Sequence, residues 1–345
     1  MPWRRGLWIG AFVWRAWRGD AEAACGAQEG GAGGMNAWTL GSLFTGYGGL
    51  DMGVKAALGG ERREVWCSDV AAGPVKLIDR SGRFPVNLGD VTLIDWDNVE
   101  PVDVLAGGSP CQDLSLAGGR KGMKPGTRSG LWEAMIRGVE KLRPHLVVWE
   151  NVNGALSAEA FSLMEPGTGC VGDGRDGPVL RALGRVLGDL ANVGYDAWWG
   201  VIRASDVGAP HRRARLFVVA ADADRDPWYV RWFGAAGAAQ RGRAFGDAQG
   251  CGGEGVRLLP TPTASQMDGR KSPAYSGSGS FYDIVQAGRR GLIPYIRGIA
   301  RWEGVFREAP DPIDETGRLS TLFVEWMMGL PEGWVTDPGL GLSRA

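Results

Sequence analysis

Short apolar runs recur along the chain between residues 39 and 221, and each is five to seven residues long. Runs of this length, bounded by glycine, proline or aspartate, are typical of buried β-strands. We therefore predict strands at residues 40–44, 64–68, 102–107, 146–150, 199–203 and 215–221.

Helical segments separate some of these runs. The segment 130–142 places Leu131 and Met135 on one apolar stripe, and the segment 178–194 begins with proline and ends with glycine. A further helix is expected at residues 50–58. Strands that alternate with helices predict an α/β fold with a doubly wound, mostly parallel sheet.

The pattern divides the chain into four parts. Residues 1–34 combine a tryptophan-rich start with a Gly/Ala-rich stretch and are expected to be a disordered extension, because arginines interrupt the apolar stretch that a signal peptide needs. Residues 35–221 form the α/β domain. Residues 222–316 form a small, loop-rich second lobe, and residues 317–345 return to the first domain.

Composition excludes several classes of protein. Hydrophobic residues make up 44% of the 345 residues, which excludes general disorder, and no apolar run reaches the roughly 18 residues of a membrane span. The five cysteines form no CxxC pair and only two histidines are present, so we expect neither a disulfide framework nor a metal site. This cysteine usage indicates a reducing compartment such as the cytoplasm.

The second lobe is basic, although the whole chain carries a formal charge of only −1. Residues 225–307 hold 12 Lys and Arg against 6 Asp and Glu, with aromatic residues interspersed. This pattern suits the solvated face of a small domain as well as it suits a nucleic-acid-binding surface.

A glycine-rich turn follows the first predicted strand. The sequence from Phe44 to Gly49 contains Gly46, Gly48 and Gly49, which let the backbone turn sharply and approach a ligand closely. Such turns serve dinucleotides, S-adenosylmethionine or no ligand, and the spacing is not the GxGxxG of dinucleotide sites.

Two acids follow the next elements of the same predicted sheet edge. Asp69 ends the second strand, where a carboxylate often binds ribose hydroxyls, and Asp90 follows the third element. Each acid alone is more often a cap or a turn residue. Together with the glycine-rich turn they predict a nucleoside cofactor.

Cys111 stands in a loop where the third strand ends, between Pro110 and Gln112. A lone cysteine is usually buried and inert. Here the loop presents the thiol at the carboxyl edge of the sheet, and Arg120 and Lys121 would favour the thiolate.

Glu150 ends the next core strand, which places a carboxyl group at the same edge. Arg213 and Arg215 alternate at the start of a strand and therefore project to the same side. A thiol, a carboxylate and two cations would bind an anion or a polar heterocycle. The alternative is that the arginines cap acidic loops.

These motifs, in this order, resemble the cytosine-5 DNA methyltransferases. The resemblance spans about residues 39–334. It rests on FTGYGG (44–49) as the first cofactor motif, SPCQ (109–112) as the catalytic loop, ENV (150–152), HRRAR (211–215), and the block from Arg318 through Glu325 to Pro331.

The resemblance implies a class I methyltransferase-type fold and a methyl transfer from S-adenosylmethionine to C5 of a cytosine that is flipped out of double-stranded DNA. It implies that Cys111 attacks C6 and that Glu150 binds N3 and the exocyclic amine. It further implies that Arg215 holds the cytosine O2 while Arg213 supports the thiol side of the site.

The resemblance also assigns the cofactor site and the domains. Residues 35–221 become the catalytic, S-adenosylmethionine-binding domain, and residues 222–316 the target-recognition lobe. A monomer without metal is implied, in the cytoplasm of a bacterium or a phage-infected cell. The cofactor would be held by Asp69 at the ribose, by Asp90 at the adenine, and by a wall of Phe44, Gly46, Gly48, Gly49 and Leu131.

The sequence departs from the family pattern in three places. His211 replaces a glutamine, Val70 stands where a larger side chain often stacks on adenine, and residues 317–345 lack the last Gly-Asn motif. The last departure predicts a truncated sequence or a pocket that is completed differently. An inactive DNA-binding homologue therefore stays open as an alternative, and so does an RNA cytosine methyltransferase, which would be built on the same fold. A nicotinamide oxidoreductase has less support.

Overall fold

The computed structural model describes seven parts of the chain, namely residues 38–58, 62–110, 131–156, 159–160, 180–225, 259 and 288–336. The sequence predictions that fall on the remaining residues lie outside this description. They include the extension 1–34, the loop that carries Cys111, and most of the basic segment 225–307.

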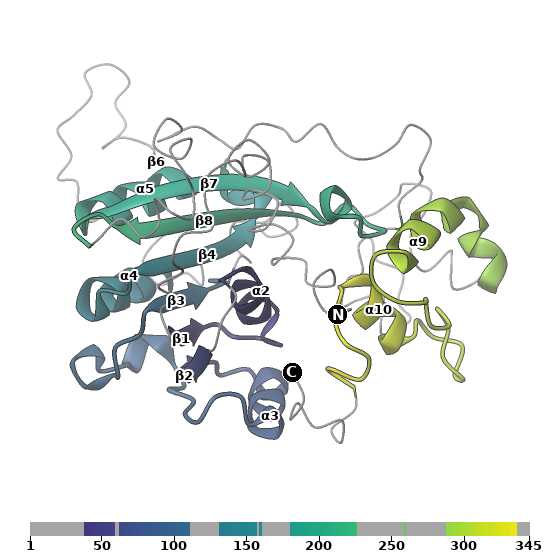
Figure 1. The fold of residues 1–345 in the computed structure, drawn as a ribbon, viewed down its shortest axis with the longest axis horizontal. Helices are drawn as coiled ribbons and strands as arrows, with labels where there is room; N and C mark the ends of the chain where they lie inside the picture. The colour runs from purple at the N-terminus through teal and green to yellow at the C-terminus, as the bar shows by residue number, and fades with distance from the viewer. Residues whose placement is uncertain are drawn as a thin grey trace, which may run out of the picture.

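A six-stranded sheet in the order β2-β1-β3-β4-β8-β7 forms the centre of the molecule (Figure 1). All six predicted strands are confirmed, with ends that differ by a few residues. Their bounds are β1 (Trp38–Leu43), β2 (Arg62–Ser68), β3 (Val104–Gly107), β4 (Leu146–Val152), β7 (Tyr195–Arg203) and β8 (Ala214–Asp222). A separate two-stranded sheet pairs β5 (Glu159–Ala160) with β6 (Leu180–Arg181).

The predicted mostly parallel sheet is confirmed: β2, β1, β3 and β4 are parallel to one another, and β8 is the strand that departs from this direction. Strand β8 runs antiparallel to both β4 and β7. The reason is that no helix lies between β7 and β8. Their connection holds only a short 3-10 helix, η5 (Ala204–Val207), and a parallel crossover needs a longer connection. The first residues of β8 therefore lie beside the last residues of β4.

Helices cover both faces of the sheet, as the doubly wound fold requires. Helix α2 (Gly49–Leu58) packs on one face, and α4 (Trp132–Leu142) and α5 (Ala182–Asn192) pack on the other. Helix α5 starts four residues later than predicted, because residues 180–181 form β6. Helix α3 (Ala72–Ser81) was not predicted.

The core on the α4 side is built around two tryptophans. Trp132 of α4 and Trp149 of β4 are both 0% exposed, and their rings meet edge to face with centroids 5.5 Å apart. The Trp132 indole donates to Asp189 Oδ2 of α5 at 2.9 Å, so its buried N–H is satisfied. Replacing either ring by alanine would cost about 3–5 kcal/mol.

A second lobe lies beyond the carboxyl ends of the parallel strands (Figure 1). It contains the 3-10 segment η6 (Gly288–Tyr295) and the helices α9 (Ile296–Glu303) and α10 (Thr321–Met327). Its core joins Trp302 of α9 to Trp326 of α10, and Ala204 of η5 packs against the same cluster. Helix α10 thus packs with the lobe, while the domain limits at residues 222 and 317 stay predictions.

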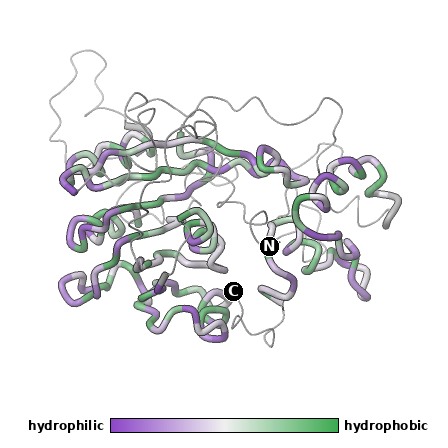
Figure 2. Tube along the Cα trace, viewed as in Figure 1, coloured by the Kyte–Doolittle hydropathy of each residue, from purple (hydrophilic) through white to green (hydrophobic). Residues whose placement is uncertain are grey.

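Hydrophobic residues follow the strands, and hydrophilic residues gather in the loops at their ends (Figure 2). None of the helices in the described part of the chain is long and apolar enough to cross a membrane.

Candidate active site

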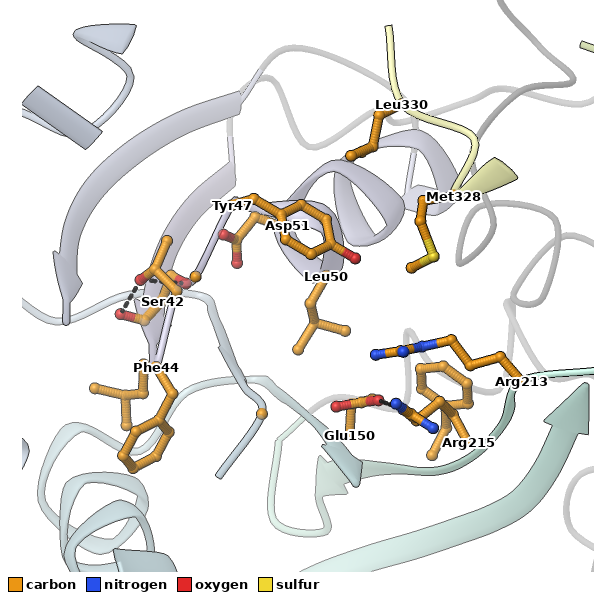
Figure 3. Close-up of a pocket in the computed structure, with 16 residues that line it drawn as sticks. Ser42, Phe44, Tyr47, Leu50, Asp51, Glu150, Arg213, Arg215, Met328 and Leu330 are labelled. Carbon is orange, nitrogen blue, oxygen red and sulfur yellow. Dashed lines mark hydrogen bonds and ion pairs between the residues drawn. The ribbon is translucent and has the colours of Figure 1, made fainter. Parts of the chain in front are cut away.

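A cavity of about 180 Å³ opens at the carboxyl edge of the sheet, next to the second lobe (Figure 3). Four parts of the chain line it: the segment 42–51 after β1, the ends of β3 and β4, the start of β8, and the residues that follow α10. The predicted site residues that line it are Phe44, Gly46, Gly49, Glu150, Arg213 and Arg215.

The glycine-rich turn has an unusual backbone. Phe44, Gly46 and Gly48 have φ values of +54°, +58° and +78°, so every second residue is left-handed. This conformation costs a non-glycine residue such as Phe44 about 1–2 kcal/mol. A Cβ on Gly49 would overlap the Tyr47 ring, so only glycine allows the ring to lie there.

Asp69 holds this turn in place from the end of β2. Its Oδ2 accepts a hydrogen bond from the Gly46 N–H at 2.8 Å, and its Oδ1 accepts one from the Ala71 N–H at 2.9 Å. The carboxylate is therefore hydrogen-bonded to the backbone of the turn, and it is not among the residues that line the cavity.

Glu150 and Arg215 form an ion pair inside the cavity. Arg215 Nε lies 2.8 Å from Glu150 Oε1, and the two side chains are 17% and 27% exposed. Burial raises the pKa of Glu150, while the charges of Arg215 and Arg213 oppose the rise. The carboxyl group is thus poised to exchange a proton nearer to neutral pH than an ordinary glutamate.

Arg213 lies two residues before Arg215, and both side chains line the cavity, as their alternation predicts. The Arg213 guanidinium points into the cavity beside the Glu150–Arg215 pair (Figure 3). The reversed direction of β8 brings both arginines to this edge, because Arg215 pairs with Val152 at the end of β4.

Asn151 and Trp149 anchor the chain just before the cysteine loop. Asn151 Nδ2 donates to the Ser109 carbonyl at 3.1 Å, and the Trp149 indole donates to Ser109 Oγ at 3.0 Å. Ser109 is therefore fixed to β4 beside Glu150. Cys111 itself lies outside the described residues, so its position relative to Glu150 and Arg215 stays a prediction.

His211 joins the arginine strand to the second lobe. Its ring is 0% exposed, and Nε2 lies 3.1 Å from the Met327 carbonyl at the end of α10. Burial and the nearby Arg213 charge lower its pKa to about 3, so the ring is neutral at pH 7 and donates this hydrogen bond.

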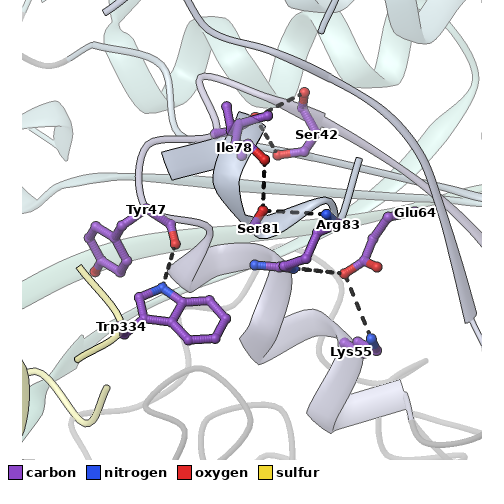
Figure 4. Close-up of polar contacts among 9 residues, drawn as sticks. Ser42, Tyr47, Lys55, Glu64, Ile78, Ser81, Arg83 and Trp334 are labelled. Carbon is purple, nitrogen blue, oxygen red and sulfur yellow. Dashed lines mark hydrogen bonds and ion pairs between the residues drawn. The ribbon is translucent and has the colours of Figure 1, made fainter. Parts of the chain in front are cut away.

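The residues after α10 are fastened to the glycine-rich turn (Figure 4). The Trp334 indole donates to the Tyr47 carbonyl at 2.9 Å, and Arg83 stacks over the Trp334 ring. Glu325 of α10 accepts hydrogen bonds from the backbone N–H groups of residues 333, 335 and 336. The residues that follow α10 are thus joined to the glycine-rich turn by a hydrogen bond and held to α10 by Glu325.

Comparison with known proteins identifies the family. The profile of the C-5 cytosine-specific DNA methylases matches residues 38–235, which is more than half of the chain. The chain belongs to this family.

Several methylases of bacteria are similar to this chain. Type II methyltransferase M.NgoFVII of Neisseria gonorrhoeae is 30% identical over 52% of this chain and 42% of its own length. Type II methyltransferase M.Eco47II of Escherichia coli is 30% identical over 54% of this chain and 40% of its own length. The chain thus matches less than half the length of these relatives.

Among solved structures, a putative DNA modification methyltransferase encoded within an E. coli prophage is similar, with a TM-score of 0.38 and 23% identity. The match covers 54% of this chain and 47% of that chain.

Four of the residues expected to bind the cofactor do not line the cavity, namely Asp69, described above, and Gly48, Asp90 and Leu131. Gly48 faces Arg83 in a smaller neighbouring hollow. Asp90 is exposed and caps the 3-10 helix η1 (Val91–Leu93), accepting from Thr92 N at 2.9 Å. Leu131 precedes α4 and packs against the core. Their contacts with a cofactor stay predictions.

Sequence reasoning missed other residues that line the cavity, among them Tyr47, Leu50 and Asp51. Tyr47 and Leu50 lie within or next to the glycine-rich turn, so their position in the sequence was enough to predict that they lie near the cavity. Met328 and Leu330 come from the block that was recognised only as a motif. Asp51 carries no motif signal, and only its burial in the folded chain distinguishes it.

Proposed function

We propose that this protein transfers a methyl group from S-adenosylmethionine to C5 of a cytosine flipped out of double-stranded DNA. The observation that carries the proposal is a single cavity in which the Glu150–Arg215 pair and Arg213 face the glycine-rich turn. Membership of the C-5 cytosine-specific DNA methylases gives the proposal its chemistry.

Cys111 is the proposed nucleophile. Its thiolate adds to C6 of the cytosine, the new C–S bond forms, and the displaced electron pair moves to C5 and N3. Ser109, anchored to β4 by Asn151 and Trp149, sets the starting point of the loop that carries this thiol. S-adenosylmethionine, when bound, supplies an electrophilic methyl group. Loss of the C5 proton and expulsion of the sulfur from C6 restore the aromatic ring.

Glu150 is the proposed proton donor to N3. Burial raises the pKa of its carboxyl group, which favours the protonated form that can donate. Its Arg215 partner orients the carboxyl group through the 2.8 Å contact and would bind the cytosine O2. Arg213, whose guanidinium points into the cavity, would support the negative charge of the thiolate.

The residues of the turn fit a nucleoside methyl donor. Gly46 places bare backbone on the cavity wall, so a ligand can pack against the chain there without meeting a Cβ, while Gly49 makes room for the Tyr47 ring. Asp69 is the proposed ligand of the ribose hydroxyls. It does not line the cavity itself, so it would accept from a ribose at the cavity's rim through the lone pairs that Gly46 and Ala71 leave free.

The second lobe is the proposed target-recognition region, with double-stranded DNA as the partner. It lies beyond the same sheet edge as the cavity, and the segment 225–307 is basic in sequence. A positive surface there would bind phosphates and make DNA affinity fall with salt.

A trapping experiment tests this function. A duplex in which 5-fluorocytosine replaces cytosine should form a covalent adduct with the protein only when S-adenosylmethionine is present, because fluorine blocks the final elimination. Cys111→Ser should abolish the adduct while DNA binding persists. Binding without any adduct in the unchanged protein would favour an inactive DNA-binding homologue. An adduct with transfer RNA but not with the duplex would favour the RNA methyltransferase.

A further inference from the structure

Asp51, in the first turn of α2, is a carboxylate buried in the wall of the cavity. It is 1% exposed, and neither of its oxygens meets full hydrogen-bond geometry with a partner among the described residues. The Ser42 hydroxyl is close enough to lower the pKa of this carboxyl group through a hydrogen bond, but it is neutral and can donate to one oxygen at most. Buried polar groups in proteins are almost always paired, and an unpaired buried charge is strongly unfavourable. A buried acid on a cavity wall that has no charged partner and at most one neutral one therefore indicates a ligand group that completes it.

The nearby cations are already engaged by another acid (Figure 4). Arg83 donates to Glu64 Oε1 from Nη2 at 2.9 Å and from Nε at 3.2 Å. Lys55 Nζ lies 3.7 Å from the same oxygen. Arg83 is close enough to act on Asp51 electrostatically, but it forms no ion pair with it, and burial raises the pKa of Asp51 to about 6.

The other charged residues on the cavity wall form no ion pair with Asp51 either. Glu150 holds Arg215 in an ion pair, and Arg213 points toward that pair (Figure 3). At pH 7 Asp51 is mostly ionised and lacks a cation of its own among the described residues. It lies on the glycine-rich side of the cavity, across from the proposed cytosine site.

We propose that the Asp51 carboxylate binds the α-ammonium group at the amino-acid end of the methyl donor. This inference rests on the proposed function. The adenosine end of that donor carries no positive charge, whereas the amino-acid end carries an ammonium. An ammonium group has three N–H donors and can satisfy both Asp51 oxygens, but a sulfonium has none.

Binding calorimetry on the unchanged protein gives the first test. S-adenosylhomocysteine keeps the ammonium but lacks the sulfonium charge, and its deaminated analogue lacks both. Loss of a charge-assisted hydrogen bond corresponds to about 10- to 100-fold, so the deaminated analogue should bind that much more weakly than S-adenosylhomocysteine. Equal affinity for the two ligands would overturn the inference without the use of any variant.

Asp51→Asn gives the second test, since it keeps the shape of the side chain and removes its charge. It should weaken S-adenosylhomocysteine by about the same 10- to 100-fold factor and leave the deaminated analogue unchanged. Equal weakening of both ligands would mean a structural role for Asp51 and would overturn the inference. Weakening of S-adenosylmethionine alone would assign Asp51 to the sulfonium, which also overturns it.

Asp224→Asn is the matched control. Asp224 follows β8 at the far end of the sheet, its side chain is 86% exposed, and its replacement changes the net charge equally. All three ligands should bind to this control as they bind to the unchanged protein. If the unchanged protein binds none of the ligands, the proposed cofactor falls and this inference falls with it. Normal ligand binding with no effect of Asp51→Asn overturns the inference alone.

Discussion

Neighbouring residues of β4 perform opposite tasks because side chains alternate along a strand. Glu150 continues the row of Leu146 and Val148, which faces α2 and the cavity. Asn151 points the other way, is 1% exposed, and fixes Ser109. A motif of two adjacent polar residues thus supplies both the proposed proton donor and the anchor of Ser109.

His211 gives a pH-dependent prediction at the same scale. An unfolded histidine has a pKa of about 6.5, whereas the folded ring has a pKa of about 3. Below pH 6.5 the His211 ring binds a proton in the unfolded chain but not in the folded chain. The free energy of unfolding therefore falls as the pH falls. The loss at pH 5 should be about 2 kcal/mol.

His211→Gln should remove this loss, because glutamine keeps a donor for the Met327 carbonyl and does not titrate. Urea unfolding at pH 7 and pH 5 measures the effect. His145→Gln, at the chain's other histidine, is the control, since the His145 side chain is 25% exposed and should contribute less. The same pH dependence in His211→Gln and the unchanged protein would contradict the assignment.

At the scale of elements, the sequence predicted the helices and strands whose formation depends on local patterns of apolar residues. Apolar runs marked all six strands, and the amphipathic stripe marked α4. The direction of β8 was not predictable from its apolar run, because direction depends on the connection and not on the strand. The placement of Arg213 and Arg215 at the cavity follows from that direction. Asp51 was missed because its burial exists only after α2 packs on the sheet.

The glycine-rich turn gives a prediction for this scale. Gly49→Ala should force the Tyr47 ring from its place, and we expect S-adenosylmethionine affinity to fall about 10-fold and stability to fall by about 1–3 kcal/mol. Gly73→Ala in α3 is the matched control, because a Cβ there meets nothing within 4 Å. The control should be neutral or stabilising by up to about 1 kcal/mol. Calorimetry and urea unfolding measure both variants, and a wild-type result for Gly49→Ala would show that the turn tolerates a side chain.

At the scale of the whole molecule, hydrogen bonds near the cavity join the second lobe to the sheet domain. His211 bonds to the end of α10, and Trp334 bonds to the Tyr47 carbonyl. Both contacts end on elements that carry site residues. A movement of the lobe, such as one that accompanies DNA binding, would therefore displace the backbone of the glycine-rich turn.

Trp334→Phe tests this link, since phenylalanine keeps a ring beside Arg83 and removes the indole donor. The free energy of unfolding should fall by about 1 kcal/mol, and S-adenosylmethionine should bind a few-fold more weakly. Trp199→Phe in β7, away from the cavity, should lower stability without changing cofactor affinity. Equal cofactor affinity in Trp334→Phe and the unchanged protein would show that the lobe and the turn act independently.

The reversed strand also sets a minimum for the chain that connects the two domains. Strand β8 starts at the cavity, is nine residues long, and ends at Asp222, at the opposite end of the strands. By Leu259 the chain is back at the cavity edge, where the Leu259 N–H bonds to the Pro210 carbonyl. Nine extended residues span about 30 Å. An engineered deletion between Asp222 and Leu259 must therefore leave at least about nine residues, at roughly 3.3 Å each. A shorter connection could not span the length of β8, and the hydrogen bond between Leu259 and Pro210 would be lost.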